Sequence, residues 1–178
     1  MTVGRYAAIY GGLAGLVILA LIITTFALHE QFAFTGTMWF GYLVMVVVMA
    51  PFTLVGVKRY RDIERGGVIG FWRALGVGLA IAGVATLAYA VVWEGYLALT
   101  GYRFMDDMIA SAIAKLHADG VTGAALADKL AELEWMREAY KSRMTRLAFT
   151  VMEISPVALV LPFVSAAMLR NPQILPAR

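Results

Sequence analysis

Four long apolar blocks, almost free of charge, constrain this chain more than any other feature of its sequence. They run from about 6 to 28, 38 to 57, 71 to 99 and 147 to 169. A helix needs about 20 apolar residues to cross roughly 30 Å of hydrocarbon. The chain is also 61% hydrophobic and only 15% charged, whereas soluble domains are about a quarter charged. We therefore expect an all-α integral membrane protein, a single membrane domain of residues 1–178 with four transmembrane helices.

The first block could be mistaken for a secretory signal, because Arg5 precedes it. The apolar region of a signal is only about 7–15 residues long and ends at a small-residue cleavage site. This block is longer and continues to Leu28, where His29 and Glu30 follow. We expect it to be a retained span.

Lysine and arginine gather in the regions that a four-span chain places on one side of the membrane. The two chain ends and the segment between spans two and three hold eight basic and two acidic residues, while residues 100–146 hold seven of each. Short basic loops stay cytoplasmic, so we expect both termini in the cytoplasm and residues 100–146 outside. We also expect the basic side chains of the second loop to contact anionic lipid headgroups, which attract each such residue by about 1 kcal/mol. They are Lys58, Arg59, Arg61, Arg65 and Arg73.

The polar segment of about 103–146, between spans three and four, carries two helical stripes. Apolar residues recur at three-four spacing from Met105 to Leu116, and again from Leu126 into span four. Gly120 follows the first stripe, where a left-handed residue often ends a helix. We expect an extramembrane helical hairpin that reverses near Gly120, with its second helix continuous with span four. The two helices of this hairpin either pack against each other in solvent, or the hairpin binds a partner protein or a second copy of the chain.

The sequence lacks the residues of the common catalytic and metal sites. There is no cysteine, which excludes thiol catalysis, disulfides and thiolate metal sites. His29 and His117 fall in different outward segments and form no metal-binding pair. No phosphate-binding glycine loop and no nucleophile elbow is present. We therefore expect no metal, no cofactor and no catalytic residue, and the topology accounts for the basic loop without nucleic-acid binding.

Small residues predict where the helices approach one another closely. Gly11 and Gly15 form a small-xxx-small step in span one, and Gly76, Gly78 and Gly83 lie in span three. In lipid, helices associate largely through close backbone approach at such residues. Packing within one chain is the favoured interpretation, and contact between copies is the alternative.

Two carboxylates lie within the outer halves of the spans. Glu94 follows Trp93 near the end of span three, and Glu153 lies about two turns inside span four, three residues before Pro156. Acids within the membrane are costly and usually face the bundle interior. Pro156 frees a backbone carbonyl one turn earlier. Glu94, Glu153 and Pro156 are thus the candidates for an outward-opening ligand or proton site. The alternative for either acid is a structural role, in which it hydrogen-bonds the bundle together.

Several motifs resemble a family catalogued as domain of unknown function 4199. They are GVKRYRD at 56–62, GGVIGFWRAL at 66–75, the pair Trp93-Glu94, and the run that begins MEISPV at 152 and continues to the C-terminus. The resemblance covers most of the chain. It implies a small protein of the bacterial inner membrane, and it supplies no activity and no catalytic residue.

Two functions are compatible with these features. The first is a non-catalytic accessory or assembly component that binds lipid, a membrane protein partner or a second copy through the hairpin and the basic loop. The alternative is a transporter or ligand-binding protein, for a small solute or coupled to protons, with a site at Glu94 and Glu153. An enzyme acting on lipid is least favoured, because the sequence shows no nucleophile with a base.

Overall fold

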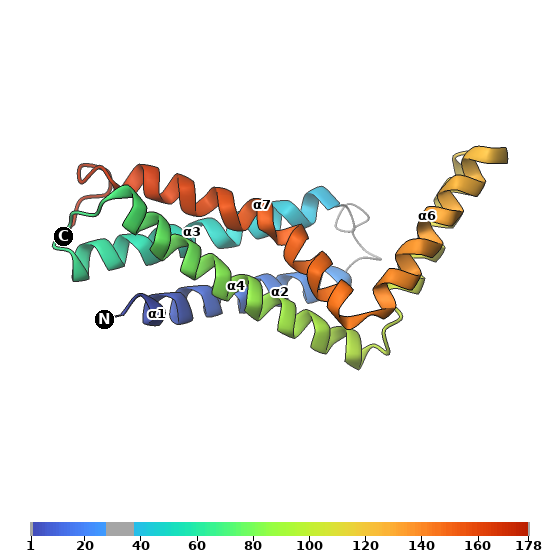
Figure 1. Ribbon diagram of the computed structural model, residues 1–178, viewed down its shortest axis with the longest axis horizontal. Coiled ribbons are helices and arrows are strands. Elements are labelled where there is room, and N and C mark those ends of the chain that lie inside the picture. Colours follow the sequence, from blue (N-terminus) through green and yellow to red (C-terminus); the bar gives the residue numbers. More distant parts are fainter. Residues whose placement is uncertain (1, 28–37, 178) are drawn as a thin grey trace. The chain divides into compact units, whose positions relative to one another are not determined.

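The computed structural model describes residues 2–27 and 38–177 (Figure 1). Every regular element in this part of the chain is a helix. The elements are α1 (Val3–Tyr6), the π-helical turn η1 (Ala7–Gly11), α2 (Gly12–Ala27), α3 (Met38–Glu64), α4 (Phe71–Leu99), α5 (Phe104–Ala118), α6 (Gly123–Lys141) and α7 (Arg143–Leu169). The all-α prediction is therefore confirmed.

Four helical stretches among the described residues are long and apolar enough to cross a membrane. They are Val3–Thr24, Trp39–Glu64, Phe71–Leu99 and Arg143–Leu169. The predicted number of spans is confirmed, and the third span has the predicted bounds. The second helix continues to Glu64, beyond the predicted 57, so most of the basic motif forms the last turns of α3 rather than a loop. The predicted end of the first span, Leu28, lies outside the described residues.

The chain divides into two compact units. The first unit combines Met1–Val92 with Val151–Arg178, and the second unit is Trp93–Thr150. The first unit thus contains α1 to α3 and most of α4 and α7, which lie side by side in Figure 1. The second unit contains α5 and α6 with the adjoining ends of α4 and α7.

Close packing in the first unit depends on several of the predicted glycines. A Cβ on Gly11 would lie 2.4 Å from the Ile81 carbonyl oxygen, and one on Gly15 would lie 2.7 Å from the Ala88 Cβ. The start of the first span therefore rests directly on the backbone of α4. Gly78 packs similarly against α7, because a Cβ on Gly78 would lie 3.0 Å from the Cβ of Pro162. Packing within one chain is confirmed at these three positions.

Two other glycines of span three do not take part in this packing. A Cβ on Gly76 or Gly83 would meet no atom of another described segment within 4 Å. The prediction of a helix contact is wrong for these two residues within the chain. The reason is angular position, because residues on a helix share a face only at three- and four-residue spacing.

The second unit contains the two predicted helices of the segment after span three. Helix α5 packs against α6, and Gly120, between them, has the left-handed φ of +72°. The expected continuity of α6 with span four is wrong, because α6 ends at Lys141 and Ser142 has extended backbone, with φ −76° and ψ 124°. Serine with extended backbone is a favourable residue before a helix, and its Oγ accepts a 3.5 Å hydrogen bond from the Thr145 N–H of α7.

Candidate functional sites

The second unit contains a buried ion pair between Glu94 of α4 and Arg146 of α7. Arg146 Nε donates to Glu94 Oε2 at 3.0 Å, and Arg146 Nη2 donates to Oε1 at 2.5 Å. The two side chains are only 8% and 9% exposed. A guanidinium that binds both oxygens of a carboxylate makes a strong and geometrically specific pair. Arg143 adds a more distant contact, with its Nε 3.7 Å from Oε1.

The remaining donors of Arg146 fix the junction between α6 and α7. Its Nη1 donates to the carbonyls of Tyr140 and Lys141, at 2.9 and 3.0 Å. These carbonyls end α6, where helical donors are missing. The guanidinium carbon also lies 4.6 Å from the centre of the Tyr102 ring, a cation–π distance. Arg146 therefore ties α4, the α4–α5 turn and the end of α6 to one buried carboxylate.

A cavity of about 260 Å³ lies beside this pair within the second unit. It is lined by Tyr102, Met105, Asp106, Arg137, Tyr140, Lys141 and Arg146. Several charged side chains of its lining form ion pairs. Arg137 Nε lies 3.1 Å from Asp106 Oδ1, and Lys141 Nζ lies 2.5 Å from Glu138 Oε1. The cavity wall thus offers aromatic rings and balanced charges rather than a free carboxylate.

Glu94, one of the predicted site residues, is therefore committed to Arg146. Sequence reasoning placed Glu94 correctly at the end of its span but did not find its partner, which lies 52 residues away. The sequence contains little that identifies Arg146 as the partner of Glu94. Arg146 is a basic residue at the edge of a span, and it resembles the other interfacial cations of this chain.

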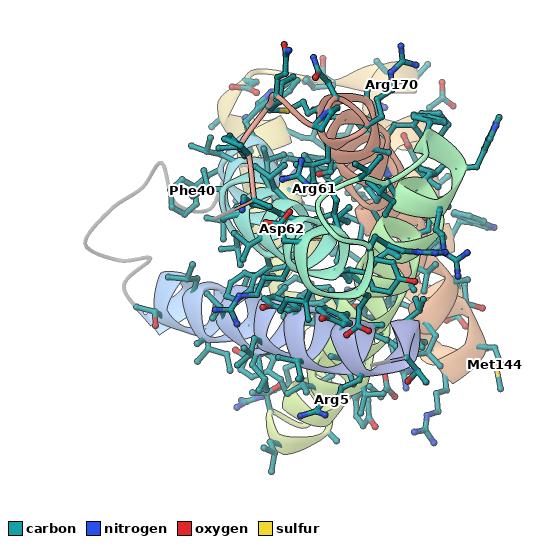
Figure 2. The ribbon with its side chains drawn as sticks, turned by 90° about the vertical axis from the view of Figure 1, so that its left-hand side faces the viewer. Arg5, Phe40, Arg61, Asp62, Met144 and Arg170 are labelled. Carbon is teal, nitrogen blue, oxygen red and sulfur yellow. The ribbon has the colours of Figure 1, made fainter. Side chains whose placement is uncertain are left out.

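The first unit buries one of the arginines that the sequence assigned to lipid headgroups. Arg61 of α3 has 0% exposure, and Figure 2 shows it beside Asp62. Its Nε donates to Asp62 Oδ1 at 2.7 Å. Its other nitrogens donate to the carbonyls of Ile174, at 3.0 Å, and of Leu175. The headgroup assignment is therefore wrong for Arg61, because its donors hold the C-terminal segment against α3.

The other basic residues of this end remain on the surface. Arg59, Arg65 and Arg73 are exposed, and Lys58 is partly buried, with its Nζ 2.5 Å from Asp62 Oδ2. A cavity of about 490 Å³ opens at the turn between α3 and α4. Its lining is Glu64, Arg65, Val68, Ile69, Gly70 and Arg73.

Aromatic hydroxyls order the charged groups around this cavity. Tyr60 is buried and accepts a 3.4 Å hydrogen bond from Arg73 Nε. Tyr6 donates at 3.2 Å to Glu64, and its ring meets that of Tyr60 edge-on at 5.4 Å. The two tyrosine hydroxyls thus hold one arginine and the one carboxylate of the cavity lining, Arg73 and Glu64.

Glu153 and Pro156 lie on the surface of α7 in the first unit, and both are exposed. The expectation that Glu153 points into the bundle is therefore wrong. Span four is apolar nearly all round, so its sequence did not reveal which face packs inward. Its neighbours Ile154 and Val157 are buried, so Glu153 lies at the edge of the packed face of α7 and not within it. Glu94 and Glu153 belong to different units, and the proposed shared site stays a prediction.

No group of three or more histidine or acidic side chains suited to a metal ion occurs in the described residues. His29 lies outside those residues, and His117 is exposed in the last turn of α5. No curated protein and no solved structure matches this chain. A family described as "Protein of unknown function (DUF4199)" matches residues 5–171. The chain therefore belongs to this family.

Proposed function

We propose that this protein is a non-catalytic membrane component whose basic end binds the headgroups of anionic lipids. The observation that carries the proposal is the cavity of about 490 Å³ whose lining includes the exposed Arg65 and Arg73, while its one carboxylate, Glu64, accepts a hydrogen bond from Tyr6. A guanidinium presents paired N–H donors that match the oxygens of a phosphate. Basic pockets at the ends of transmembrane helices bind phosphate-rich lipid headgroups in this way.

The side chains around the cavity suit the membrane interface. Ile63, Val68 and Trp72 are 65%, 62% and 79% exposed at the same turn. Large apolar and aromatic groups beside arginines are favourable where hydrocarbon meets headgroups, because tryptophan combines an apolar body with a polar edge. A lipid bound here would place its phosphate between the arginines and its acyl chains along these apolar side chains.

The alternative, a transporter or proton-coupled binding protein, has no comparable support. Glu94 is already bound on both oxygens by Arg146. Its carboxylate therefore offers no free position for a solute or a proton carrier without first breaking a buried ion pair.

Lipid binding at the cavity can be measured by native mass spectrometry of the detergent-solubilised protein titrated with cardiolipin or phosphatidylcholine. We expect preference for cardiolipin. Replacing both arginines, Arg65→Gln with Arg73→Gln, should weaken cardiolipin binding by roughly thirtyfold, since each basic residue contributes about 1 kcal/mol and about 1.4 kcal/mol is a factor of ten. Arg103→Gln is the control for the loss of a positive charge, because Arg103 is exposed in the second unit and does not line this cavity. Equal losses in the control and the double variant, or equal binding of both lipids, would reject the proposal.

We also propose that the protein resides in a bacterial inner membrane with both termini in the cytoplasm. The support is the distribution of basic residues, which gathers eight of them at the chain ends and around the α3–α4 turn. Single cysteines can be introduced without background, because the chain has none. We expect a cysteine at position 120 to react with an impermeant maleimide added to intact spheroplasts, and one at position 66 to react only after lysis. The reverse pattern would show the opposite orientation.

A further inference from the structure

The carboxyl of Glu153 lies on an exposed face far from both ends of the fourth span. Ten residues separate it from Arg143 and sixteen from Leu169, the ends of that span. At 1.5 Å per residue these separations are about 15 Å and about 24 Å. Glu153 is exposed, and no described residue forms a hydrogen bond or ion pair with its carboxyl.

The same face carries a second polar group. Pro156 has no N–H and cannot donate the helical hydrogen bond to the Met152 carbonyl. Met152 is itself 64% exposed. The Glu153 carboxyl and a backbone carbonyl deprived of its helical donor therefore belong to adjacent residues, on a surface that a spanning helix exposes to hydrocarbon. Polar groups left unmatched there cost a few kcal/mol, so this part of α7 requires a hydrogen-bonding partner.

The rest of this face has the pattern of a helix contact. Exposed apolar side chains follow toward the C-terminal end of α7 at spacings of three and four residues, the repeat that aligns side chains along one side of a helix. They are Leu159, Val160, Phe163 and Val164, all 48–57% exposed. Such ridges pack against the grooves of a neighbouring helix.

We propose that this face is the contact between two copies of the chain, with Glu153 of one copy hydrogen-bonded to Glu153 of the other. A neutral carboxyl has one O–H donor and a free acceptor oxygen, so two identical groups satisfy each other. In a two-fold dimer, residues near the axis meet their own copies. A second copy thus supplies the missing donor, whereas lipid tails supply none. The proposal is independent of lipid binding at the basic end.

The dimer can be tested with the full-length protein reconstituted in phosphatidylcholine vesicles. We expect single-molecule photobleaching to show dimers that dissociate on dilution in the membrane. Glu153→Leu should weaken association by on the order of tenfold, the scale of an intramembrane hydrogen-bond contribution. Glu153→Gln should retain it within a few-fold, because an amide both donates and accepts. Leu87→Ala is the control, because Leu87 is 63% exposed on α4, and it should leave association unchanged.

Cysteine cross-linking tests the same contact without altering Glu153. We expect Val160→Cys to form a disulfide between copies under mild oxidation and Leu87→Cys to form none. A monomer at every protein-to-lipid ratio would overturn the proposal, and would direct attention to a different membrane protein as the donor. A dimer that cross-links through position 87 and tolerates Glu153→Leu would overturn it as well.

Discussion

Removing either charge of the Glu94–Arg146 pair should destabilise the protein by about 3–5 kcal/mol, because the remaining charge is left buried without a partner. Arg146→Leu should cost more than Glu94→Leu. The arginine also binds the Tyr140 and Lys141 carbonyls at the end of α6, and those groups would lose their donors. The free energy of unfolding in a fixed detergent, obtained from denaturant titration followed by tryptophan fluorescence, measures both effects.

The double variant Glu94→Leu with Arg146→Leu distinguishes a coupled pair from two independent side chains. Removing both charges leaves no unpaired ion, so the combined loss should be smaller than the sum of the single losses by more than about 1 kcal/mol. Arg143→Gln is the matched control. Its side chain is 73% exposed and 3.7 Å from Glu94, and such a pair contributes less than about 1 kcal/mol. Strict additivity of the two leucine substitutions would show that the pair does not act as a unit.

Adding a single methyl group at Gly11 or Gly15 is expected to destabilise the first unit by about 1–3 kcal/mol, the usual cost of overpacking. In Gly11→Ala the new Cβ would lie 2.4 Å from the Ile81 carbonyl oxygen, and in Gly15→Ala it would lie 3.0 Å from the Ala85 carbonyl oxygen. These atoms belong to the backbone of α4, which cannot yield without separating the helices. Thermal unfolding in detergent should detect the loss as a lower melting temperature.

Gly12→Ala provides the control within the same segment. Among residues 2–27 and 38–177, a Cβ at Gly12 meets no atom of another segment within 4 Å, and alanine restricts the unfolded chain more than glycine does. We therefore expect no loss, or a gain of less than about 1 kcal/mol. A melting temperature that falls equally in all three variants would indicate a general effect of glycine replacement in this helix rather than contact with α4.

The local properties of the chain were predictable from the sequence. An apolar block of the third span's length, charged only near its two ends, forms a spanning helix in any fold, because unpaired backbone groups are costly in hydrocarbon. That is why the bounds 71–99 were correct. The left-handed Gly120 was also foreseeable, since glycine alone adopts that conformation without steric cost. The break at Ser142 was missed because the apolar spacing continues across it, whereas the chain changes direction through one backbone rotation.

The sites depend on contacts that the linear sequence does not encode. Glu94 meets Arg146 across 52 residues, and Arg61 meets the Ile174 carbonyl across 113. Several arginines lie at the ends of the spans. Until the helices are placed, nothing marks which of them binds Glu94 or which of them is buried. Glu153 shows the same limit, because a helix apolar on every side has no pattern that marks its packed face. The sequence by itself determined which segments enter the membrane, since that is a matter of length and charge. Only the tertiary structure decided which charges are paired, buried or exposed, because those states depend on which helix lies beside which.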